Sequence, residues 1–88
     1  MRKEWLDILD VKSEKEIDNI SNEKWGDISN SQKLSEEFIE KFQDKVWWVN
    51  ISMCQKLSEK FIEKFQDKVD WYNISECQKL SEEFIEKL

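Results

Sequence analysis

The chain has 88 residues, a formal net charge of −6, one glycine and no proline, and 39% of its residues are charged. A chain of this length forms at most one small domain, and the near absence of glycine and proline favours helices over strands and tight hairpins. No apolar run approaches the roughly 20 residues of a membrane span, and the first residues do not lead into a signal-peptide core. The sequence therefore predicts a single-domain, all-α protein in the cytoplasm of the cell that contains it, with no contact to a membrane.

A repeat of 23 residues dominates the sequence. The segments that begin at Trp25 and Trp48 agree at 17 of 22 aligned positions, and the segment that begins at Trp71 agrees with the second at 14 of 18. We divide the chain into a degenerate cap unit at residues 1–24, a first repeat at 25–47, a second at 48–70 and a truncated third at 71–88.

The two ends of the array differ from its middle. In the cap unit, Trp5 and Ile8 reproduce the spacing of Trp and Ile that opens each later unit, and Ser13 echoes, with a slightly shifted offset, the serine before their second helix. Atypical end units of this kind cap stacked arrays. At the other end the sequence reaches Leu88 without the Gln-Asp-Lys-Val of the earlier units, which predicts a shortened last helix that closes the stack.

Each repeat carries the signals of two short helices. The first begins at the Trp, with an Ile three residues later, and Gln-Lys-Leu joins it to the second, which begins after a serine suited to an N-cap. In the second helix Phe38, Phe42 and Val46 lie four residues apart and form an apolar stripe. Because such short helices are marginal alone, we expect helical hairpins stacked as a small solenoid.

The string QKLSEEFIEKFQDKVDW, which covers most of residues 32–88 with small changes, resembles a repeat found in tandem arrays in giant viruses of amoebae and in some bacteria and phages. This resemblance implies easily duplicated repeats of the interaction type, with no catalytic residues and no named partner. In size, acidity and repeat type the chain is also similar to small phage proteins that act against host defences, including anti-CRISPR inhibitors.

The residues that chemistry needs are missing. The sequence has no histidine and no glycine-rich phosphate loop, so we expect neither an enzyme nor a cofactor. Cys54 and Cys77 occupy the same position in successive units, but two thiolates without histidine are an incomplete zinc site. We expect them to be free, half-buried thiols. With no basic face in the sequence, direct nucleic-acid binding is not expected either.

The candidate binding residues are the positions that differ between otherwise similar units. They concentrate in the first helix of each unit and include aromatic and apolar side chains that are typical of protein interfaces. A stacked array displays such positions along one surface, although neutral drift on a tolerant surface is an alternative explanation. The residues predicted to bind a partner are Trp47, Val49, Met53, Asp70, Tyr72 and Glu76.

These observations favour a non-enzymatic module that binds a protein partner, in the manner of a phage inhibitor that occludes a surface of a host protein. Two alternatives stay open at this point. The chain is a structural protein that associates with itself, for example as a homodimer, or it is an acidic mimic of nucleic acid. In the second alternative charge would drive binding, which salt would then weaken strongly.

Overall fold

The computed structural model describes residues 2–31 and 33–87, and this part of the chain consists of helices joined by short linkers, with no strand. The all-α prediction is confirmed. The described helices are α1 (Lys3–Leu9), the 3-10 helix η1 (Glu14–Asn19), α2 (Asn22–Ser31), α3 (Glu36–Lys41), α4 (Trp48–Cys54), α5 (Glu59–Lys64), α6 (Trp71–Cys77) and α7 (Glu82–Lys87).

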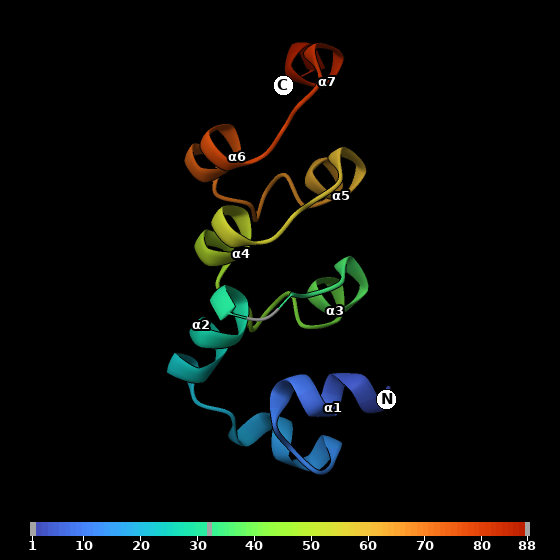
Figure 1. The fold of residues 1–88 in the computed structure, drawn as a ribbon, viewed down its shortest axis with the longest axis vertical. Coiled ribbons are helices and arrows are strands. Elements are labelled where there is room, and N and C mark those ends of the chain that lie inside the picture. The colour runs from blue at the N-terminus through green and yellow to red at the C-terminus, as the bar shows by residue number, and fades with distance from the viewer. Residues whose placement is uncertain (1, 32, 88) are drawn as a thin grey trace.

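From α2 onward the helices form two rows (Figure 1). One row contains α2, α4 and α6, and the other contains α3, α5 and α7. Along the first row α2 packs against α4, and α4 packs against α6. The molecule is elongated as a result, with extents of 44 × 22 × 19 Å.

The second helix of each unit starts where the sequence predicts. The hydroxyl oxygens of Ser35, Ser58 and Ser81 accept hydrogen bonds from backbone amides three residues later, at 3.1, 3.2 and 3.1 Å. These helices are shorter than the apolar stripe suggests, because α3 ends at Lys41 and Phe42 leaves helical geometry. Val46 is still buried, since a further turn closes with a 3.0 Å bond from its amide to the Phe42 carbonyl.

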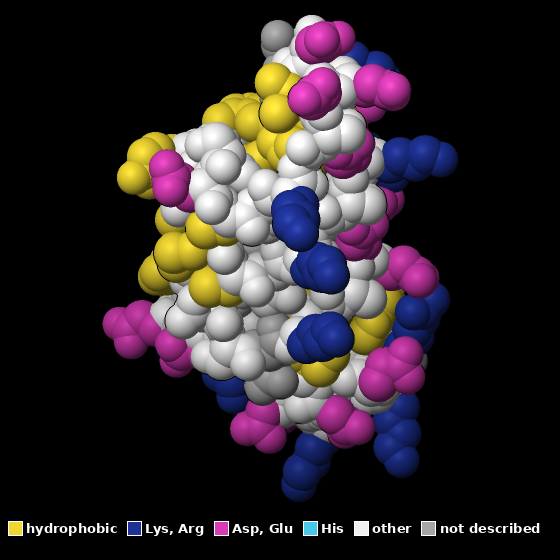
Figure 2. All heavy atoms as spheres, turned by 45° about the horizontal axis from the view of Figure 1, so that its top comes forward, with side chains coloured by type: hydrophobic (Ala, Val, Ile, Leu, Met, Phe, Trp, Pro, Cys, Tyr) yellow, Lys and Arg dark blue, Asp and Glu magenta, His cyan; other side chains and the backbone are white. Residues whose placement is uncertain are grey.

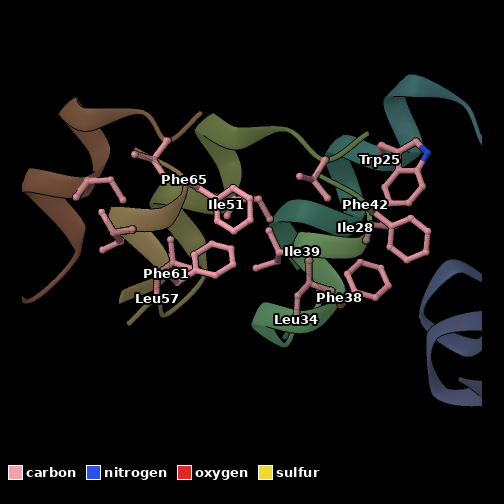
Figure 3. Packing of buried hydrophobic residues seen from close by; sticks show 14 of the residues in the cluster. Trp25, Ile28, Leu34, Phe38, Ile39, Phe42, Ile51, Leu57, Phe61 and Phe65 are labelled. Atoms are coloured by element: carbon pink, nitrogen blue, oxygen red, sulfur yellow. The ribbon is translucent and has the colours of Figure 1, made fainter. Parts of the chain in front are cut away.

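The core lies between the two rows of helices (Figure 3). Its fully buried members include Phe38, Ile39 and Ile51, and in Figure 3 the side chain of Ile39 lies between its own unit and Ile51 of the next. Trp48 occupies the position of the buried Trp25 one unit later, but it is only half-buried. Its ring lies against Phe65 with centroids 5.5 Å apart, so it covers the edge of the core.

The cap unit is helical, but it meets the array differently from the repeats. Its α1 lies beside α3 and not in the row of α2 (Figure 1), so the Trp5 ring stands edge-on to Phe38 and Phe42, at 5.8 and 6.0 Å. An ion pair between Asp10 and Lys24, at 3.3 Å, joins the end of α1 to α2. The helix α2 already begins at Asn22, inside the range assigned to the cap unit.

Neighbouring units are joined by a recurring pair of glutamine bridges. The Gln55 side chain accepts from the Leu34 amide at 3.0 Å and donates to the Ser29 carbonyl at 3.0 Å. One unit later Gln78 repeats both bonds, to the Leu57 amide at 3.1 Å and to the Ser52 carbonyl at 2.9 Å. Since Gln55 is buried, its two partners have no access to water in its absence.

Glutamate and serine form a second recurring bridge at the other row of helices. The Glu36 carboxylate accepts from the Ser58 amide at 2.6 Å and from its hydroxyl at 3.0 Å. Glu59 accepts in the same way from Ser81, at 2.5 and 3.0 Å. The conserved spacing of the units therefore places the same donors and acceptors opposite each other at both junctions.

The last unit leaves its outer face uncovered. Its helix α7 has six residues, as α3 and α5 have, so the expectation of a shortened last helix is wrong. The stack is not closed, because Ile85 is 54% exposed, whereas the equivalent Ile39 and Ile62 are fully buried. Within the described residues, no helix has the length and apolar character needed to cross a membrane.

Candidate protein-binding surface

The predicted binding residues all lie on or just before two neighbouring helices. Val49 and Met53 are on α4, Tyr72 and Glu76 are on α6, and Trp47 and Asp70 are the N-cap residues of these two helices. Because α4 packs against α6, the six residues belong to one side of the molecule. We call them together the variable ridge.

The ridge exposes large apolar side chains. Tyr72 is 72% exposed, Val49 53%, Met53 44% and Trp47 39%. Figure 2 shows hydrophobic side chains gathered along the side of the molecule that carries this row of helices. Soluble proteins seldom expose neighbouring large apolar groups of this kind unless the surface has a binding role.

Trp47 is less free than the sequence suggests. Its indole nitrogen donates to the Asn22 side chain at 3.1 Å, and its backbone amide donates to the Ser29 hydroxyl at 3.0 Å. The ring lies over Gly26 so closely that a Cβ added there would stand 3.0 Å from three ring carbons. The helix α2 therefore covers part of the indole, and Trp47 has a structural role beside its place on the ridge.

Asp70 holds the equivalent position one unit later, and it is half-buried. Its backbone amide donates to the Ser52 hydroxyl at 3.0 Å, and its carboxylate accepts from the Asn73 side chain at 2.6 Å. In the second unit Asn50 instead donates to the Gly26 carbonyl at 3.2 Å. The Asp70 carboxylate is thus already engaged within its own helix, which makes it a weaker candidate for partner contact than Tyr72.

Sequence reasoning missed two exposed residues in the last unit. Trp71 is 36% exposed although the equivalent Trp25 is buried, and Ile85 is 54% exposed. Both occupy positions that a repeat pattern assigns to the core. Nothing in the pattern of the unit distinguishes them from their counterparts in the earlier units.

The two cysteines do not form a metal site in the described part of the chain. Both thiols are free and both are exposed, which corrects the expectation that they are half-buried. Cys54 lies 2.7 Å from the side-chain oxygen of Asn30 in the preceding unit. Among the described residues, no group of three or more His, Cys, Asp or Glu side chains is arranged to hold a metal ion.

Charged side chains lie beside the ridge and are mixed in sign (Figure 2). Lys33, Lys56 and Lys79 recur in the linkers and are exposed, which gives a row of three positive charges that the sequence analysis did not anticipate. Elsewhere lysines pair with acids of the neighbouring unit, as Lys64 does with Glu40 at 2.9 Å. Exposed pairs of this kind add little stability.

No family model, curated protein or solved structure matches this chain.

Proposed function

We propose that this chain is a non-enzymatic protein-binding module, built as a short helical solenoid, whose variable ridge contacts a protein partner. Inhibition of a host protein by occlusion is the form of this activity that the likeness to phage proteins favours. The partner covers the ridge and thereby removes its apolar side chains from water.

The observation that carries the proposal is the exposure of Tyr72, Val49 and Met53 on two packed helices. The glutamine and serine bridges between units repeat with little change, whereas the residues on the ridge differ at each equivalent position. A constant scaffold that carries different surface residues is the arrangement by which repeat proteins form recognition surfaces.

The test compares three immobilised proteins in lysate of the organism that carries the gene. They are the wild type, a double variant Met53→Ala and Tyr72→Ala, and a control variant Lys60→Ala on α5, whose side chain is exposed away from the ridge. We expect mass spectrometry to identify a protein that the wild type and the control retain and the double variant loses. Retention by all three proteins would refute the ridge as the binding surface.

Two further measurements separate this proposal from its alternatives. Sedimentation at micromolar concentration detects self-association, which a structural homodimer requires and a monomeric binding module does not. The affinity of the purified protein for its purified partner, measured at low and at high salt, then tests whether the chain mimics the charge of nucleic acid. Apolar contact predicts a weak dependence on salt, whereas an acidic mimic of nucleic acid loses most of its affinity.

A further inference from the structure

The lysines of the linkers form a line of positive charge along one side of the stack. Lys33, Lys56 and Lys79 occupy the same position in three successive units, each two residues before the serine that caps the second helix. All three side chains are exposed. Figure 2 shows a column of basic side chains beside the hydrophobic ones. We call these three residues the lysine row.

The lysine row has no acidic partner within the described part of the chain. Other lysines are bound to a carboxylate of the preceding unit, as Lys64 is to Glu40 and Lys68 is to Asp44. Among the described residues, no hydrogen bond or ion pair engages an ammonium group of the lysine row. In a chain with 20 acidic residues and a net charge of −6, three neighbouring unpaired cations leave room for acids from outside.

The lysine row borders the variable ridge directly. Met53 of the ridge lines a surface hollow of about 380 Å³ together with Lys56 and Lys79. This hollow lies where α4 and α6 pass into their linkers, and the exposed Cys54 and Cys77 also line it. A group that enters the hollow therefore lies beside an apolar side chain and two lysines at the same time.

The apolar residues of the ridge run parallel to the lysine row. Val49 and Tyr72 occupy equivalent positions on the packed helices α4 and α6, so they form a line along the stack. Met53 lies one helical turn beyond Val49, on the side of the linker. Glu76, at the position of Met53 in the next unit, is the acidic exception. The surface is thus an apolar strip with positive charge along one edge.

The spacing of the units fits a helix that lies along this strip. Packed helices are about 8–10 Å apart, so successive members of the lysine row repeat at about this distance. An α-helix advances about 10.5 Å in seven residues, or nearly two turns, and then presents the same face again. A β-strand repeats the same face about every 6.5–7 Å, which falls out of step with the lysines. Acidic residues seven apart on a helix therefore match the row.

We propose that the partner presents an amphipathic α-helix to this surface, with an apolar stripe on Val49 and Tyr72 and with acidic residues, seven apart, against the lysine row. This inference rests on the proposed function, because it uses the same ridge, and it defines the chemistry of the protein partner. Exposed ion pairs add little affinity each, so the lysine row mainly selects which helix binds and in which orientation.

Two other occupants match the surface less well. Phosphates of a nucleic acid would also be drawn to the lysines, but the net charge of −6 repels a polyanion and the neighbouring strip is apolar. A second copy of this chain lacks a helix of the required length. Its longest described helix, α2, has 10 residues, whereas acids opposite all three lysines require about 15.

The test selects helices from a displayed peptide library on the immobilised full-length protein. Each peptide has about 18 residues, which span the lysine row at about 1.5 Å per residue. Leucines are fixed as one stripe, and Glu, Gln or Lys is allowed at each flanking position. We expect the selected peptides to carry Glu at positions seven apart on one flank. A synthetic peptide of the selected sequence should shift the nuclear magnetic resonance signals of the Val49, Tyr72 and Lys56 amides.

Two triple variants of the protein locate the charged contact. The first removes the lysine row by Lys33→Gln, Lys56→Gln and Lys79→Gln. The control removes the same charge at exposed sites in the cap unit and on α5 by Lys12→Gln, Lys15→Gln and Lys60→Gln. We expect the first variant to bind the selected peptide about tenfold more weakly and the control to bind it as the wild type does. Circular dichroism verifies that both variants keep their helices.

Several outcomes would overturn the inference. They are selection of neutral or basic flanks, no selected helix, or equal affinities of the two triple variants. An oligonucleotide that binds the wild type and not the first variant, or a dimer that the first variant dissociates, would identify a different occupant and also overturn it. Failure of the ridge proposal has another signature, because the double variant Met53→Ala and Tyr72→Ala would then bind the peptide as the wild type does.

Discussion

Replacement of Gln55 by alanine tests whether the buried glutamine bridge holds neighbouring units together. The change removes an acceptor 3.0 Å from the Leu34 amide and a donor 3.0 Å from the Ser29 carbonyl. Both partners remain in the protein interior with nothing to bond, and a buried polar group left in this state costs about 1–3 kcal/mol. For the two groups together we expect the free energy of unfolding to fall by about 2–6 kcal/mol.

A loss of this size is large for a small chain. With 88 residues, the total free energy of unfolding is about 4–13 kcal/mol. Urea unfolding followed by far-ultraviolet circular dichroism measures the change. Gln55→Glu should also destabilise the protein, because a carboxylate keeps an acceptor for Leu34 but has no donor for Ser29.

Gln78→Ala is the matched control, because Gln78 makes the same two bonds, and a third to the Gln55 carbonyl at 2.7 Å, but is only half-buried. Water reaches the groups that it frees, so we expect less than half the loss seen for Gln55→Ala. Equal losses in the two variants, or a loss below about 0.5 kcal/mol for Gln55→Ala, would refute the argument that burial makes this bridge important.

Two other substitutions test local features of the fold. Ser58→Ala removes the N-cap of α5 and one of the two bonds to Glu36, and we expect a loss of about 1–2 kcal/mol in urea unfolding; an unchanged midpoint would contradict the capping role. In a protein that also carries Trp47→Ala, Gly26→Ala should stabilise α2 by about 0.5–1 kcal/mol. With Trp47 in place the gain should be smaller, because the added Cβ would stand 3.0 Å from carbons of the Trp47 ring. The four proteins of this double-mutant cycle are compared by thermal unfolding, and simple additivity would show that Trp47 does not rest on Gly26.

The helices and their starts follow from local sequence, and these were predicted well. A serine three residues before a phenylalanine amide caps a helix by a contact within one turn, so the sequence alone indicates it. The apolar stripe likewise identified Phe38 and Val46 as core residues. Their spacing did not show that α3 ends at Lys41, because a turn that follows a helix keeps nearly the same period.

Features that depend on contact between units were harder to predict. The repeat pattern marks Ile85 as a core residue, although it is 54% exposed, because the pattern of one unit does not show which contacts its neighbours supply. For Trp47 the pattern indicates an exposed indole, whereas the absence of a side chain at Gly26 on α2 leaves room for the ring to pack against that helix. The cap unit shares the Trp and Ile spacing of the repeats, yet Trp5 packs on the other row of helices.

The bridges between units also have an evolutionary consequence. If recombination removed the whole second unit, Gln78 would come to face Leu34 and Ser29, and Ser81 would come to face Glu36. The glutamine and serine bridges would again form with equivalent partners, so these junctions would survive the deletion. Val49 and Met53 would be lost at the same time, and Tyr72 and Glu76 would take their places on the ridge. Under the proposed function, a single recombination would therefore change the residues that contact the partner, while the junctions between units stay the same.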